Sequence, residues 1–61
     1  MKWVIVYIAY NGIKTAGGIR FDNYGAACME QEILDFQNPN TAHLIYTVDE
    51  WEREKAEYGW R

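Results

Sequence analysis

The hydrophobic residues are densest near the beginning of the chain. Residues 3–10 read WVIVYIAY, and such a run of β-branched and aromatic side chains is typical of a β-strand. One face of this strand carries Val4, Val6, Ile8 and Tyr10. The other face carries Trp3, Ile5, Tyr7 and Ala9. Because both faces are apolar, the pattern predicts a central strand that is covered on each side.

A tight hairpin is predicted directly after this strand. Both residues of the pair Asn11-Gly12 tolerate the positive φ of a type I′ turn, and a two-residue turn there places Ile19 opposite Val4. The pair Gly17-Gly18 weakens the middle of the returning strand. A bulge, or a longer loop with a short strand over residues 19–22, therefore remains open.

The next periodic segment predicts a helix over residues 24–37. Asp22 and Asn23 are suitable N-cap residues, and Pro39 restricts the residue before it to non-helical conformations. The main apolar stripe, expected to face the sheet, consists of Ala26, Met29, Ile33 and Phe36. A second, weaker stripe, expected to meet the C-terminal segment or a partner, consists of Tyr24, Ala27, Cys28 and Leu34.

Residues 42–48 predict a third strand, and a short helix follows it. Thr47 and Glu50 have the spacing of a capping box, so we expect the helix to begin near Asp49 and to run to about Tyr58. Gly59 is a natural residue to end it, because glycine readily adopts the left-handed conformation after a helix.

These elements predict one α+β domain over residues 1–61 with the order ββαβα. If the third strand lies beside the first, the result is a three-stranded antiparallel sheet of order 2-1-3. We expect the long helix on the face of Val4 and Val6. The face of Trp3, Ile5 and Tyr7 is then left to the short C-terminal helix, a second subunit or a target.

Composition offers little support for chemistry. Cys28 is the only cysteine, which excludes an intrachain disulfide and Cys₄ or Cys₂His₂ zinc sites and favours a reducing, cytoplasmic setting. We interpret Cys28 as a small core residue and His43 as a surface residue at a strand end. The chain contains no serine. We therefore expect no enzyme, no cofactor and no metal, and the eight-residue apolar run is too short for a membrane span.

Charge is unevenly distributed along the chain. Residues 1–20 carry three bases and no acid, whereas residues 21–61 carry nine acids and three bases, which gives +3 and −6. This balance argues against direct nucleic-acid binding. Glu50, Glu54 and Glu57 follow one edge of the last helix. This row is either a mimic of nucleic-acid phosphates or, as charge runs usually are, a solvated face, so we expect Glu54→Ala to leave stability unchanged or slightly higher.

The aromatic content favours binding to a protein. Ten of the 61 residues are Trp, Tyr or Phe, more than a small core requires, and such residues are enriched in interfaces. In the expected register Arg20 lies opposite Trp3, which predicts a cation–π pair. The predicted binding residues are Trp3, Ile5, Tyr7, Arg20, Trp51, Tyr58 and Trp60, together with the acids Glu50, Glu54 and Glu57.

In size, aromatic richness, acidity and lack of catalytic groups, the whole chain resembles small phage-encoded inhibitors, which include anti-CRISPR proteins and blockers of host polymerases or nucleases. The resemblance is to a class and is carried by no motif. It implies a non-catalytic inhibitor that occludes a site on a larger host protein in the bacterial cytoplasm. The alternative is a homodimeric structural or regulatory module that pairs its Trp3, Ile5 and Tyr7 face with itself. A metal-free enzyme fragment is the third hypothesis.

Overall fold

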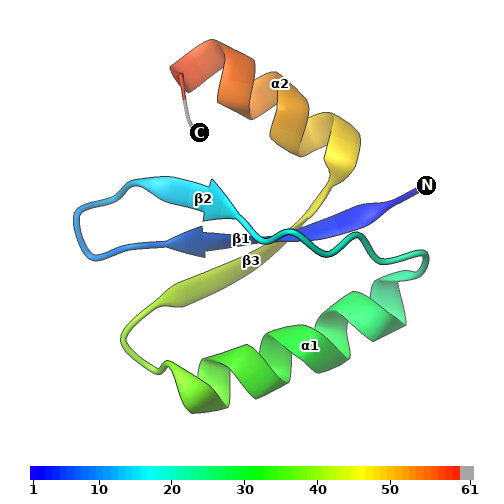
Figure 1. Cartoon of the computed structure of the whole chain (residues 1–61), viewed down its shortest axis with the longest axis vertical. Helices are drawn as coiled ribbons and strands as arrows, with labels where there is room; N and C mark the ends of the chain where they lie inside the picture. The colour runs from blue at the N-terminus through cyan, green and yellow to red at the C-terminus, as the bar shows by residue number, and fades with distance from the viewer. Residues whose placement is uncertain (60–61) are drawn as a thin grey trace.

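The computed structural model describes residues 1–59 and has the predicted α+β architecture. The elements, in chain order, are β1 (Trp3–Ile8), β2 (Lys14–Ala16), α1 (Tyr24–Gln37), β3 (Ala42–Thr47) and α2 (Val48–Tyr58). The strands form one antiparallel sheet of order β2-β1-β3, so the predicted topology with β1 in the centre is confirmed (Figure 1).

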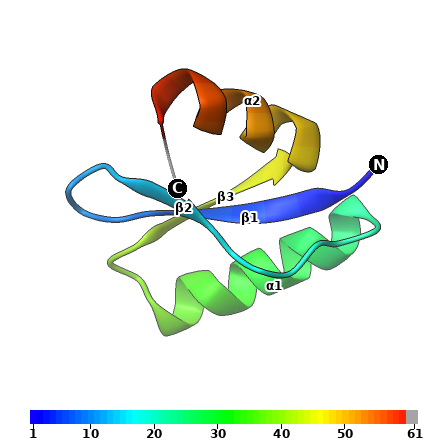
Figure 2. The same ribbon diagram turned by 45° about the horizontal axis from the view of Figure 1, so that its top comes forward.

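The two helices cover opposite faces of the sheet (Figures 1 and 2). Trp51 of α2 packs against Val4 and Val6, and these three side chains form the buried cluster of the core. On the other face, Tyr24 of α1 lies edge-on to Trp3 with 4.9 Å between the ring centroids. The expected assignment of the long helix to the Val4 and Val6 face is therefore wrong. The short helix α2 follows β3 without a loop and lies over the Val4 and Val6 face, where Trp51 is buried.

Local side-chain chemistry fixes the ends of both helices. The Asn23 side chain accepts a hydrogen bond from the Ala26 amide at the start of α1, which has the predicted bounds. Thr47 and Glu50 form a complete capping box, so α2 begins one residue before the predicted start. Gly59 ends α2 with a φ of 74°.

The hairpin register differs from the prediction by one residue. The Ala9 amide donates to the Ile13 carbonyl, so the loop contains three residues, 10–12, and only Gly12 has a positive φ, at 84°. Val6 therefore pairs with Ala16. A shift of one residue moves every side chain of β2 to the other face, which explains why Lys14 and Ala16 lie on the face covered by α2.

A bulge follows β2, as one of the two open alternatives anticipated. From Ala16 to Phe21 the chain advances five residues, while its partner strand advances three, from Val6 to Trp3. Phe21 thus takes the place opposite Trp3. The predicted pair of Arg20 with Trp3 is wrong, because Arg20 turns back and donates to the Gly17 carbonyl.

Candidate protein-interaction surface

A stripe of large apolar side chains lies exposed along α1. The exposed fractions are 68% for Met29, 49% for Ile33 and 89% for Phe36. Their spacing of i, i+4 and i+7 places them on one side of the helix, which we call the α1 outer stripe. Ala27, on the opposite side, is fully buried. The expectation that the main apolar stripe faces the sheet is therefore wrong, and it was Ala27 of the weaker stripe that became buried.

Polar contacts join α1 to β3 in this rotation. The Gln31 side chain donates to the His43 carbonyl, and an Asp35 oxygen lies 2.6 Å from Nδ1 of His43. Gln31 and Asp35 are four residues apart, so both reach the same strand from one side of the helix. These contacts face the sheet and leave the outer stripe in solvent.

His43 is buried, which corrects its interpretation as a surface residue. No part of its side chain reaches solvent, and its ring lies edge-on to Tyr7 with 5.2 Å between centroids. Its Nε2 atom is also buried and has no hydrogen-bond partner in the described residues. Within residues 1–59, no group of three or more potential metal ligands is present.

The acidic residues of α2 do not form a free row of charges. Glu54 is a structural residue, because its Oε1 lies 3.0 Å from Nζ of Lys14, which also donates to the Tyr46 hydroxyl. The backbone amide of Thr47 donates to Glu50 and holds the pKa of that carboxyl below its ordinary value. Glu57 is exposed. The three acids do line one hollow of about 350 Å³, together with Tyr46, Arg53 and Tyr58.

The structure distributes the other predicted binding residues over separate places. Trp51 is 1% exposed and belongs to the core. Ile5 is buried and Trp3 and Tyr7 are half-buried under α1. Arg20 and Tyr58 are both exposed, but they line different hollows. Arg20 lies near the start of α2, beside Val48, whereas Tyr58 is the last residue of that helix. Trp60 lies outside the described residues.

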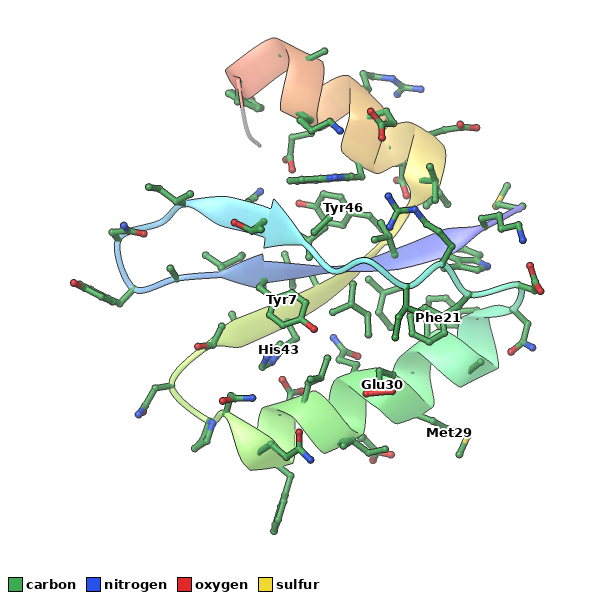
Figure 3. The ribbon with its side chains drawn as sticks, viewed as in Figure 1. Tyr7, Phe21, Met29, Glu30, His43 and Tyr46 are labelled. Carbon is green, nitrogen blue, oxygen red and sulfur yellow. The ribbon has the colours of Figure 1, made fainter. Side chains whose placement is uncertain are left out.

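A small cleft opens between the bulge and α1, and we call it the bulge cleft. It has a volume of about 70 Å³. Figure 3 shows Tyr7, Phe21 and Glu30 gathered on this side of the molecule. The residues that line the cleft are Ile5, Tyr7, Gly17, Gly18, Ile19, Phe21 and Glu30.

Sequence reasoning found the residues of the outer stripe but assigned them to the core. It did not find Gln31, Asp35 or Glu30 as residues with a role. Polar residues on a helix are usually expected to face solvent. No feature of the sequence near Gln31 or Asp35 indicated that both would contact His43.

Comparisons with protein families, curated proteins and solved structures find no match for this chain. Within residues 1–59, neither helix has the length and apolar character needed to cross a membrane.

Proposed function

We propose that this protein acts by binding another protein without catalysing a reaction, and that the α1 outer stripe is its binding surface. The observation that carries the proposal is the outward rotation of Met29, Ile33 and Phe36. Taking roughly 200 Å² for a fully exposed side chain of this size, the three expose on the order of 400 Å². That is about a tenth of the 4375 Å² surface. The largest apolar patch on a typical monomer has an area of about 300–600 Å² and is often functional.

The shape of the molecule favours a groove as the complementary surface. The molecule is thin, with principal extents of 29 × 29 × 13 Å, and α1 lies along one of its edges (Figure 1). The stripe is therefore a ridge. A standard interface buries roughly 800 Å² on each partner, about twice what the stripe supplies, so the partner must also contact the flanks of the helix. Helix-in-groove recognition has this geometry.

The finer proposal is that binding occludes a site on a larger protein, as in the small phage-encoded inhibitors that the chain resembles. A ridge that fills a groove excludes any other ligand of that groove. A homodimeric module is the alternative. Since α1 covers the face of Trp3 and Tyr7, a dimer would not pair that face directly, and the α1 outer stripe is the surface that we propose for it.

Site-specific photo-crosslinking tests the binding surface. Phe36 is replaced by p-benzoylphenylalanine in the full chain, and the cells that produce the protein are irradiated. Tyr10, which is 99% exposed on the hairpin loop, receives the same replacement as the matched control. We expect a discrete crosslinked product from position 36 and none from position 10. Equal crosslinking from both positions, or none from position 36, would contradict the proposal, and a product of twice the chain mass would indicate the dimer.

A further inference from the structure

The bulge cleft has the composition of a site for a positively charged group. Two aromatic rings, Tyr7 and Phe21, line it together with one carboxylate, Glu30. Aromatic rings attract cations through the negative charge of their faces, and a carboxylate adds a full opposite charge. The remaining lining is backbone and aliphatic side chain.

Glu30 is the only charged side chain in this lining, and it is unpaired within the described residues. It is half-buried on α1, yet neither a hydrogen bond nor an ion pair of its carboxylate occurs in residues 1–59. The other two acids of α1 differ from it: Asp35 contacts His43, and Glu32 is exposed. The oxygens of the Glu30 carboxylate are not among the buried atoms, so they reach solvent and are free to meet an incoming cation.

We propose that the bulge cleft binds an alkylammonium or guanidinium group, supplied by a lysine or arginine side chain of the protein partner. The cleft is small, with a volume of about 70 Å³, which suits the end of such a side chain. An ammonium group there meets the Glu30 carboxylate and the two rings.

The position of the cleft connects it to the α1 outer stripe. Glu30 follows Met29 directly and precedes Ile33 by three residues, so the carboxylate lies on the flank of the stripe. A partner that covers the stripe must also contact this flank. The identity of the cation as a partner side chain rests on the proposed function, whereas the chemistry of the cleft does not.

The charge of the surrounding segment favours a basic partner over a second copy of the chain. Residues 21–41 contain four acids and no lysine or arginine. Two copies joined through α1 would bring these acids together, while a groove bordered by lysine or arginine would complement them.

Titration with a lysine side-chain analogue tests the chemistry of the cleft. n-Butylammonium is added to the isotope-labelled full chain, and the amide NMR signals of Gly17 and Gly18 are followed, with 1-butanol as the neutral probe of similar size. We expect saturable shifts with n-butylammonium only. Glu30→Gln should weaken binding about fivefold, while Glu32→Gln, which removes the same charge from an exposed site on the same helix, should change it less than about twofold. Equal binding of 1-butanol, equal effects of the two substitutions, or shifts confined to α2 would overturn the proposal.

The photo-crosslinking assay identifies the source of the cation. In the chain with the photoreactive group at position 36, Glu30→Gln and an excess of n-butylammonium should each lower the yield of the crosslinked product. If the amine binds the cleft but neither treatment changes the yield, the cleft takes a free amine and the assignment to a partner is wrong. If position 36 gives no product, the proposed function fails, and the titration still decides the chemistry of the cleft.

Discussion

Replacing Glu54 by alanine is expected to destabilise the protein, contrary to the expectation from the sequence. Glu54 lies between α2 and the sheet, where its Oε1 is 3.0 Å from Nζ of Lys14. Both side chains are only 22% exposed. Lys14 also donates to the Tyr46 hydroxyl, which lies 3.4 Å from the same Glu54 oxygen. The substitution therefore removes one corner of a three-residue network that joins α2 to β2 and β3.

The magnitude follows from three contributions. Loss of hydrogen bonds to a charged group costs about 1.5–3 kcal/mol when the site is shielded from water. The buried Oε2 of Glu54 has no partner within residues 1–59, so its removal offsets part of this loss. Relief of like charge along α2 returns a few tenths of a kcal/mol. We expect a net decrease of about 1–2 kcal/mol in the free energy of unfolding, or roughly 5–15 °C in Tm for a domain of this size.

Urea denaturation of Glu54→Ala and Glu57→Ala measures this difference. Glu57 is an exposed acid on the same helix, so its replacement should change stability by less than about 0.5 kcal/mol. A double-mutant cycle with Lys14→Met should then show a coupling energy between Lys14 and Glu54 of about 1 kcal/mol. If the two alanine variants have equal stability, the network contributes nothing and Glu54 is merely a solvated charge.

Three further substitutions test the fold. Val6→Asp should unfold the chain, because it buries an unpaired charge in the core of a domain whose total stability is about 3–9 kcal/mol; circular dichroism showing a folded variant would contradict the placement of Val6. Asp35→Ala should cost about 1–3 kcal/mol in chemical denaturation, because it leaves the buried His43 ring unpaired, and Asp35→Asn should cost less. Glu50→Gln tests the pH dependence. The Thr47 amide lowers the pKa of the folded Glu50 carboxyl from its ordinary value of 4.5, so the stabilisation is present above pH 4.5 and is lost as the pH falls through the lower folded value. In thermal melts from pH 6 to pH 3, wild type should therefore lose more stability than the variant, and parallel curves would refute this.

The sequence alone predicted those features of the fold that depend on residues close together in the chain. The side chains of Asn23, Thr47 and Glu50 cap amides within three positions of themselves, and Gly59 acts at its own position. Each of these signals predicts a helix end without knowledge of the rest of the fold. The strand order was also accessible, because only a central strand needs two apolar faces.

The rotation of α1 was inaccessible for the opposite reason. It involves contacts of Gln31 and Asp35 with His43, which lies 12 and 8 residues further along the chain on another element. A count of apolar residues favoured the other rotation. The predicted hairpin register was wrong by one residue, because the loop has three residues and not two. This shift turns every side chain of β2 to the other face of the sheet. The exposed stripe depends on the rotation of α1, and the bulge cleft depends on the register of β2. The sequence therefore predicted a different binding face from the one that the structure exposes.

The outward stripe links stability to binding, which gives a final prediction. The buried apolar side chains within residues 1–59 are only Val4, Ile5, Val6, Ala27 and Trp51, while the three residues of the α1 outer stripe remain exposed. A chain this short has a small free energy of unfolding. Covering the exposed α1 outer stripe with a partner would therefore add substantially to the stability of the folded chain.

Any ligand that binds only the folded state stabilises it by mass action. A partner identified through position 36 should therefore raise the Tm of wild type in proportion to the logarithm of its concentration. The same partner should leave the Tm of Phe36→Gln unchanged, although this substitution of a side chain that is 89% exposed alters the stability of the free chain by less than about 0.5 kcal/mol. An equal rise in both proteins would show that the partner binds elsewhere.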